Sequence, residues 1–429
     1  MKHEVRIDPY RKISLRLIPL MMLLYFMAFL DRVNIGFAAL TMNQDLGFTA
    51  YIYGWGAGIF FLGYFLFEVP SNVLLQKVGP RRWIARIMIT WGVLSAAMAF
   101  VSGTWSFLVL RFLLGVAEAG FLPGMLLYLT YWFPARHRAK FIALFMAAVP
   151  LANTIGAPIS GLIVDMNDFL GLRGWQWLFL IEGLPSCVLG VVVLLVLPDG
   201  PARAKWLTAE ERAIVEADLA ADHRLTSGRS LHAMWPALVD RRVLLLCASY
   251  FGIVIALYGI GFWLPQITKA MGFSNAMVGV IVAIPYAVSA LAMLLWGRRS
   301  DRRGEHVQHV VLAAVLGVAG FIGSLLWESP WIMLCCLGLA SVGIYALLGP
   351  FWAIPPAFLR GAAAGGGIAL INSVGNLGGF VGPYLMGWIK QNTGSFTPGL
   401  GILAACLAVA ALLVLALRHE TRNAGHGVG

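Results

Sequence analysis

Hydrophobic and polar positions divide this 429-residue chain into long apolar runs separated by short polar turns. Each run reaches roughly 20 residues, the length at which an α-helix crosses a ~30 Å hydrocarbon layer. We expect twelve membrane-spanning helices near residues 15–40, 52–75, 83–102, 106–132, 139–164, 176–197, 243–266, 277–297, 307–327, 330–352, 362–389 and 398–417. Because the runs recur along the whole chain, a cleaved signal peptide followed by a soluble domain is excluded.

One long polar segment, residues 198–242, interrupts this pattern after the sixth run. Pro198 and Pro201 close the sixth helix, and Thr208 stands where the cap of a following helix is expected. The sequence therefore predicts an all-α membrane protein with a six-helix bundle at 1–197, a cytoplasmic linker at 198–242 and a second six-helix bundle at 243–429.

Composition agrees with a lipid environment. Hydrophobic residues make up 60% of the chain and charged residues only 12%, with a mean hydropathy of +0.81. Charge is thus too scarce to cover the surface of a water-soluble globule, and the lipid bilayer is the expected surrounding.

The net charge of +11 raises the question of a nucleic-acid partner, but the positions of the basic residues argue against one. Most Lys and Arg side chains fall in alternate loops, in the linker and in the two terminal segments, whereas the opposite loops hold only Arg173, Lys269 and Lys390. By the positive-inside rule, both termini are expected in the cytoplasm of a bacterium, with the chain in its inner membrane.

The five cysteines lie within apolar runs and lack metal-ligand spacing. We expect them to be small buried hydrophobic residues, without a disulfide, a metal or another cofactor.

A glycine turn with basic residues occurs once in each half, as Lys77-Val78-Gly79-Pro80-Arg81-Arg82 and as Gly297-Arg298-Arg299-Ser300-Asp301-Arg302-Arg303-Gly304. Such a turn can bond helix ends and a neighbouring carboxylate, so Arg81, Arg82, Asp301 and Arg302 are candidate gating residues. These loops resemble the signature of the major facilitator superfamily, although Asn72 and Gln76 depart from its usual Gly and Asp. The resemblance implies two halves that rock around a site at the membrane midplane.

Six ionisable residues lie inside apolar runs, and all six are in the first half: Asp31, Arg32, Glu68, Arg111, Glu118 and Glu182. An ionisable group in a bilayer is costly unless it faces a cavity or a partner, so each is a candidate for function. We therefore expect charge coupling in the N-terminal half.

Asp31 and Arg32 are neighbours on the first helix and point about 100° apart, so they need not pair with each other. The functional interpretation gives Arg32 the role of binding a carboxylate and Asp31 the role of taking up a proton. The alternative is a buried ion pair that locks helices together, which gains little over apolar packing.

Arg111 and Glu118 are seven residues apart and share one face of the fourth helix. Glu118 lies among small apolar residues, which suits a carboxyl that binds and releases a proton. The alternative is a protonated Glu118 that bonds a neighbouring helix. For Arg111, substrate contact and a structural bond to backbone carbonyls are both open.

Glu68 shares a helix face with Tyr64 and lies toward the cytoplasmic end, which favours gating over binding. Glu182 is expected to be structural, bonded to a basic group of a cytoplasmic loop or helix end.

In the second half, Asn372 and Asn376 stand one turn apart in a glycine-rich run where helices approach closely. Their amides can bind the hydroxyls or a carboxylate of a substrate. The alternative is that they only hydrogen-bond neighbouring helices to each other. Trp352, with Tyr258 and Tyr286, is a candidate for an aromatic cavity wall.

Four longer strings narrow the resemblance: Leu30-Asp31-Arg32-Val33-Asn34-Ile35-Gly36-Phe37-Ala38, Arg111-Phe112-Leu113-Leu114-Gly115-Val116-Ala117-Glu118-Ala119-Gly120-Phe121-Leu122-Pro123-Gly124, Leu129-Thr130-Tyr131-Trp132-Phe133-Pro134 and Gly174-Trp175-Gln176-Trp177-Leu178-Phe179. Together they resemble the anion:cation symporter family, and within it bacterial tartrate transporters first, then 4-hydroxyphenylacetate and phthalate permeases.

The resemblance implies that Asp31, Arg32 and Glu118 serve substrate binding and proton coupling, and that Tyr64, Trp352 and Asn372 match cavity positions. It also implies import of a small organic anion with protons as the coupling ion, by a monomer. Protons offset the ~2.3 kcal/mol per charge per 100 mV that opposes entry of an anion into the cell.

The same residues bear on other classes of membrane protein. A membrane enzyme would need a nucleophile with its base, or a metal cluster such as His-Glu-x-x-His, and the sequence shows neither. A sensor usually carries a further soluble domain, for which the linker and the terminal segments are too short. A symporter of an aromatic acid and a multidrug exporter remain the alternatives.

Overall fold

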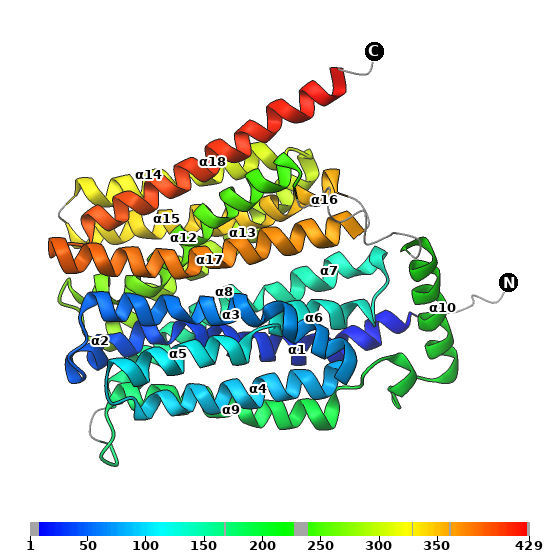
Figure 1. The fold of residues 1–429 in the computed structure, drawn as a ribbon, viewed down its shortest axis with the longest axis horizontal. Coiled ribbons are helices and arrows are strands. Elements are labelled where there is room, and N and C mark those ends of the chain that lie inside the picture. Colours follow the sequence, from blue (N-terminus) through cyan, green and yellow to red (C-terminus); the bar gives the residue numbers. More distant parts are fainter. Residues whose placement is uncertain (1–7, 167–168, 227–238, 328, 360–361, 427–429) are drawn as a thin grey trace.

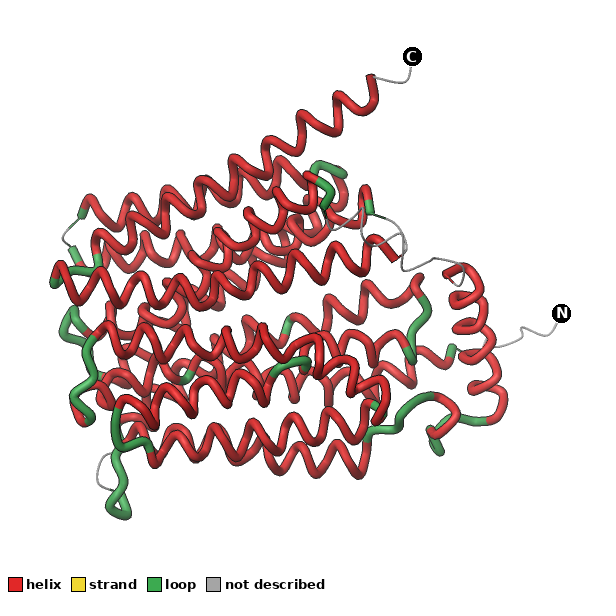
Figure 2. The backbone as a smooth tube through the Cα atoms, viewed as in Figure 1, coloured by secondary structure: helices red, strands yellow, loops and turns green. Residues whose placement is uncertain are grey.

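The computed structural model describes residues 8–166, 169–226, 239–327, 329–359 and 362–426. Within these ranges the regular structure is helical, apart from one isolated β-bridge between Phe169 and Leu172. Figure 2 shows the helices running side by side along one direction. Helices suit a membrane because each one satisfies its own backbone hydrogen bonds.

In the described part of the first half, nine α-helices and one 3-10 turn form six spans. In chain order they are α1 (Pro9–Val33) and α2 (Ile35–Asp45), α3 (Ala50–Val78), α4 (Pro80–Ala97) with the 3-10 turn η1 (Met98–Phe100), α5 (Thr104–Glu118) and α6 (Phe121–Thr130), α7 (Ala135–Met146) and α8 (Ala148–Val164), and α9 (Gly174–Val196). Figure 1 shows them as the lower group of helices, blue to green.

The second half follows the linker and forms the upper group in Figure 1. Its helices are α12 (Arg241–Lys269), α13 (Asn275–Arg303), α14 (His306–Leu326), α15 (Pro330–Ala353) with the short α16 (Pro355–Phe358), α17 (Ala362–Thr393) and α18 (Thr397–His426). The two described ends of the chain lie at the same end of the molecule, which we call the terminal end; the other is the distal end.

The linker carries the 3-10 turn η2 (Pro201–Arg203) and the helix α10 (Ala209–Thr226), which lies at the terminal end across the spans. The predicted cap at Thr208 is confirmed. Its hydroxyl accepts a hydrogen bond from the Glu211 N–H at 3.1 Å, and the Glu211 carboxylate accepts one from the Thr208 N–H at 2.8 Å. This reciprocal pair is a capping box.

The predicted all-α membrane fold is confirmed. Eleven of the expected spans are helices long and apolar enough to cross a membrane. The remaining expected span is α17, a 32-residue helix whose glycine and asparagine residues dilute its apolar character. The last helix is longer than predicted, since α18 continues past Leu417 to His426.

Lipid-facing and core-facing positions alternate around Glu68 in α3. Val69 is 65% exposed and both Leu66 and Phe67 are also exposed, whereas Glu68 itself is 5% exposed. A surface of exposed large apolar residues indicates contact with lipid. The polar side chain between them therefore points into the protein.

The two halves meet along three helix pairs, α2 with α12, α3 with α17 and α8 with α13. Glycines allow the close approach: a Cβ atom on Gly54 of α3 would lie 2.7 Å from the Pro383 carbonyl oxygen of α17. Likewise, a Cβ on Gly161 of α8 would lie 2.6 Å from the Asn275 carbonyl oxygen. Small residues at such contacts let helix backbones pack tightly in a membrane.

These glycine contacts lie toward the distal end, as do several hydrogen bonds between the halves. The Tyr53 hydroxyl donates to the Phe262 carbonyl at 2.8 Å, and Asn275 donates to the Asp165 carboxylate at 2.8 Å. The halves are thus joined most closely at the distal end.

Candidate functional site

A helix break near the middle of the first half lies next to Glu118. The helices α1 and α2 form one continuous span, since Asn34 between them keeps a helical conformation. The helix α5 ends at Glu118, and α6 begins after Gly120, whose φ of +83° lies in the left-handed region. Only glycine adopts this region at little cost, so the fourth span bends next to Glu118. Broken helices at membrane depth are typical of transporter binding sites.

Arg32 joins the two halves at this level. Its Nη2 donates to Glu118 of the same half, forming an ion pair. Its Nη1 donates to the hydroxyl of Tyr258 on α12 at 3.1 Å. Arg32 is 7% exposed and Glu118 is 1% exposed, so both charges are buried together. One cation is therefore shared between a carboxyl of the first half and a hydroxyl of the second.

Aromatic rings surround the same guanidinium. The rings of Phe29, Phe60 and Tyr64 lie 5.9, 5.4 and 5.3 Å from its central carbon. These distances fit cation–π attraction. The Nε of Arg32 is buried without a hydrogen-bond partner among the described residues. This nitrogen is a spare donor, of the kind an anionic ligand would use.

Asp31 points away from this cluster, as its position beside Arg32 on the helix predicted. Its Oδ2 accepts hydrogen bonds from Trp91 at 2.7 Å and from Ser186 at 2.9 Å, and its Oδ1 accepts one from Ser95 at 3.0 Å. Asp31 thus lies within the first half, against α4 and α9. The structure does not bring it together with Arg32.

Arg111 forms its hydrogen bonds with backbone carbonyls and not with Glu118 or Tyr258. Its Nε donates to the Gly56 carbonyl at 2.9 Å and its Nη2 to the Ala57 carbonyl at 3.3 Å. The side chain is fully buried, and its guanidinium lies 5.2 Å from the Phe60 ring. Of the two roles left open by the sequence, this geometry corresponds to the structural bond to backbone carbonyls of α3.

Glu68 and Asn372 are brought together across the halves. The Asn372 amide donates to one Glu68 carboxylate oxygen at 3.1 Å, and the Ser373 hydroxyl donates to the other at 3.4 Å. Tyr64 is buried one turn along α3, and Asn376 is half-buried one turn along α17. The pair forms a polar contact between α3 and α17 on the terminal side of Arg32.

Trp352 packs within an aromatic group of the second half. Its ring is 4.8 Å from that of Tyr250, which in turn stacks on Phe351 at 5.2 Å. Tyr258, by contrast, lies 4.5 Å from Phe61 of α3 and contacts Arg32 directly.

The two glycine turns differ in their contacts. In the first, the Arg81 N–H donates to Asp199 at 3.2 Å and its Nε lies 4.0 Å from the same carboxylate, as expected of such a turn. Arg82 is exposed. In the second turn, Asp301 and Arg302 are both exposed, and neither forms an ion pair with another described residue. The structure therefore brings only Arg81 to a carboxylate.

The expected partner of Glu182 was wrong. Among the described residues Glu182 bonds no basic loop residue; its Oε1 accepts a hydrogen bond from the Ser160 hydroxyl of α8 at 2.6 Å. Its place near the middle of α9 is far from the loops, which is the physical reason for the difference.

Sequence patterns also missed a side-chain contact between α8 and α15, which belong to different halves. The Asn153 amide of α8 donates to the Tyr345 hydroxyl of α15 at 3.3 Å. An isolated polar residue in an apolar run was the available signal for Asn153, but nothing local indicates its partner. Arg32–Tyr258 and Asn153–Tyr345 are both contacts that separation of the halves would break.

The fold and this central polar site define a class. A family model described as Major Facilitator Superfamily matches residues 21–383. The chain belongs to this superfamily and is a multi-pass membrane transporter, not an enzyme. Its two halves of helices around a buried site are the arrangement of secondary transporters that work by alternating access.

Individual proteins similar to this chain are also named as transporters. The chain is 55% identical over 414 residues to a protein of Agrobacterium vitis named "Putative tartrate transporter", covering 96% of this chain and 92% of the relative. It is 41% identical to a quinolone resistance transporter of Acinetobacter baumannii, covering 95% and 94%. Among solved structures, a bacterial homolog of the human lysosomal transporter Spinster, inward-facing and unoccupied, matches with a TM-score of 0.73 at 18% identity over 95% of each chain.

Proposed function

We propose that this protein imports a hydroxy-dicarboxylate such as tartrate together with protons, through the inner membrane of a bacterium. The observation that carries the proposal is the buried Arg32, which shares its charge between Glu118 and Tyr258 and keeps one unused donor. A guanidinium is suited to a carboxylate because it offers parallel donors in a fixed plane.

Competition for Arg32 gives a route to coupling. When a substrate carboxylate takes the guanidinium, Glu118 loses its partner while remaining buried. An unpaired carboxylate in such a place is strongly disfavoured, so Glu118 takes a proton from water. Substrate and proton then bind together on one side and leave together on the other. Asp31 keeps its predicted role as a second proton-binding candidate.

The remaining predicted residues take supporting roles. Asn372 and Asn376 would bind the hydroxyls or the second carboxylate once Glu68 releases Asn372. The Glu68 contact with α17 would serve as the gate on the terminal side, and the Arg81–Asp199 contact would hold the turn after α3. Arg111 would fix α3 to α5 and would not bind substrate.

The direct test is uptake of radiolabelled tartrate into proteoliposomes under an imposed inward proton gradient. We expect saturable accumulation by the wild-type protein. In Glu118→Gln, accumulation driven by the gradient should be lost while exchange of internal for external tartrate survives. Glu210→Gln, at an exposed carboxyl of α10, is the matched control and should behave as wild type. Absence of gradient-driven uptake in the wild type would overturn the assignment.

An aromatic acid is the second candidate substrate, favoured by the Tyr250–Trp352 ring pair. The same assay with 4-hydroxyphenylacetate distinguishes it, because Trp352→Ala should weaken uptake of an aromatic acid and leave tartrate uptake unchanged.

Export is the alternative of another class, favoured by the quinolone resistance relative. Expulsion of a quinolone under the proton gradient, with no accumulation of either acid, would replace import by export.

A further inference from the structure

A second buried carboxyl lies in the first half, apart from the Arg32 cluster. Glu182 is 2% exposed near the middle of α9. Its Oε1 accepts the Ser160 hydrogen bond, but its Oε2 is buried without a partner. Among the described residues no basic side chain forms an ion pair with it. The group is thus a buried acid with half of its acceptors unused and no cation beside it.

The groups nearest Glu182 are another acid and neutral side chains. Asp31 of α1 is close enough to interact with it electrostatically. Asn34, between α1 and α2, approaches it as well, and Ser95 of α4 packs against the neighbouring Gly183. Among the described residues, neither of these two carboxyls forms an ion pair with a basic side chain.

Other charged groups on the elements around α9 are engaged elsewhere. Arg32 pairs with Glu118, Asp45 of α2 accepts from Trp175 at one end of α9, and Arg86 of α4 stacks on a tryptophan ring. Asp31 receives three hydrogen bonds from described side chains and Glu182 receives one. A negative charge is therefore better compensated on Asp31 than on Glu182.

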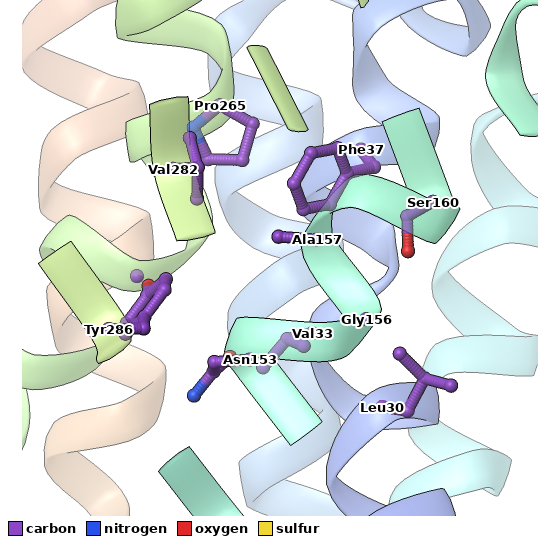
Figure 3. Close-up of a pocket in the computed structure, with 11 residues that line it drawn as sticks. Leu30, Val33, Phe37, Asn153, Gly156, Ala157, Ser160, Pro265, Val282 and Tyr286 are labelled. Carbon is purple, nitrogen blue, oxygen red and sulfur yellow. The ribbon is translucent and has the colours of Figure 1, made fainter. Parts of the chain in front are cut away.

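A small cavity connects Ser160 to the interface between the halves. It has a volume of about 10 Å³, room for one water molecule, and lies between α1, α2 and α8 on one side and α12 and α13 on the other. Figure 3 shows Asn153 and Ser160 of α8 and Tyr286 of α13 among its walls. Of these three side chains, Ser160 is the one that also contacts Glu182.

The cavity lies beside a contact that alternating access would break. Ser160 precedes Gly161, whose backbone packs against Asn275 and Gly279 of α13. Separation of α8 from α13 would open the cavity toward the distal side, and closure isolates it again. Access of water to Ser160 therefore depends on the conformation of the transporter.

We propose that Glu182 is a further proton-binding site, loaded through Ser160 from the cavity between the halves when α8 and α13 separate. A hydronium in the cavity gives a proton to the Ser160 hydroxyl, which passes its own hydrogen to the Glu182 carboxylate. Water and an unchanged serine remain, and Glu182 becomes a neutral acid. The proposal rests on proton coupling and adds a proton-binding carboxyl that does not touch Arg32.

Infrared difference spectroscopy of the purified full-length protein tests the site without transport. We expect a band from a buried protonated carboxyl at neutral pH that is absent in Glu182→Gln and present in Glu210→Gln. Ser160→Ala should shift this band and slow its appearance after a pH jump, whereas Ser341→Ala, a buried serine bonded within its own helix, should not. A spectrum unchanged in Glu182→Gln would overturn the proposal. Loss of the band on adding Na⁺ at constant pH would assign the site to sodium instead.

Transport then measures the coupling. With a pH difference of one unit, loss of one coupled proton should lower tartrate accumulation by Glu182→Gln about tenfold, with exchange retained. Wild-type accumulation in this variant would overturn the coupling role. If the wild type accumulates no tartrate, the proposed function fails, while the infrared result still decides whether Glu182 holds a proton.

Discussion

Arg32 combines two hydrogen bonds, three ring contacts and one spare donor in a single side chain. A guanidinium can do this because its donors lie in one plane and its faces are free to stack. A lysine ammonium has the same charge, but all of its donors are on one nitrogen and it has no planar face to stack. The geometry of Arg32, rather than its charge alone, is therefore what joins Glu118 to Tyr258.

Arg32→Lys should consequently weaken tartrate binding roughly 10- to 100-fold, the effect of losing one charged hydrogen bond. Binding measured by scintillation proximity with labelled tartrate checks this. Arg299→Lys, at an exposed position of the second glycine turn, should leave affinity unchanged. Wild-type affinity in Arg32→Lys would show that Arg32 acts only through its charge.

At the scale of elements, α10 is fastened to the first half by polar contacts: Lys12 bonds the Glu211 carboxylate at 2.7 Å, and Tyr10 donates to Asp218 at 2.7 Å. Just before α10, the Trp206 ring stacks on Trp132 at 5.7 Å. The linker helix thus moves with α1 and the α6–α7 region.

The fastening of α10 should depend on pH. The hydrogen bond from Lys12, with that from Thr208, lowers the pKa of Glu211 below its usual value. A carboxyl with a lowered pKa stabilises the docked state at neutral pH, and this contribution is lost as the pH falls through the lowered pKa. The protection of α10 amides against hydrogen exchange, taken relative to the intrinsic exchange rate at each pH, should therefore fall in acid. Glu211→Gln should show the faster exchange already at pH 7, whereas Glu210→Gln should not.

The helix pair α3–α17 depends on glycine at the distal end. In Gly54→Ala, the new Cβ would lie 2.7 Å from the Pro383 carbonyl oxygen, so the helices must separate at a cost of about 1–3 kcal/mol. We expect a longer distance between spin labels on the exposed Gln44 and Gln391, measured by electron–electron double resonance.

The matched control is Gly401→Ala, where the nearest atom to a new Cβ is a leucine methyl at 3.7 Å. It should leave the label distance unchanged. Equal distances in Gly54→Ala and wild type would mean that α3 and α17 tolerate the added methyl group without moving.

At the scale of the whole molecule, the two halves meet at named contacts that lie from the level of Glu68 to the distal end. The polar site lies within this interface, at Arg32–Tyr258 and Asn153–Tyr345. A rocking motion of the halves would therefore change the contacts of the site and of the distal end together.

The orientation of this motion in the membrane follows from the basic loops. We expect the linker in the cytoplasm and the loop before α9 outside. In a background without the five cysteines, a membrane-impermeant maleimide applied to whole cells should label Arg173→Cys and not Lys205→Cys. The reverse labelling would invert the orientation.

Helix number, order and membrane setting follow from the sequence alone, because apolar runs of spanning length have few other structures open to them in lipid. The sequence also identified Arg32, Glu118 and Glu68, since a buried ionisable residue in a membrane needs a partner. It supplied the cap at Thr208 because that contact is local.

Only the tertiary structure decided which partners these residues have. Arg32, Glu68 and Asn153 find their partners Tyr258, Asn372 and Tyr345 in the other half of the chain. No local pattern in the sequence indicates which residues so far apart along the chain will meet. The same holds for Glu182, whose partner is Ser160 rather than a loop cation, and for Asp31, which faces α4 and α9. Hydrophobic periodicity fixes the helices, but side-chain partners depend on how the helices pack.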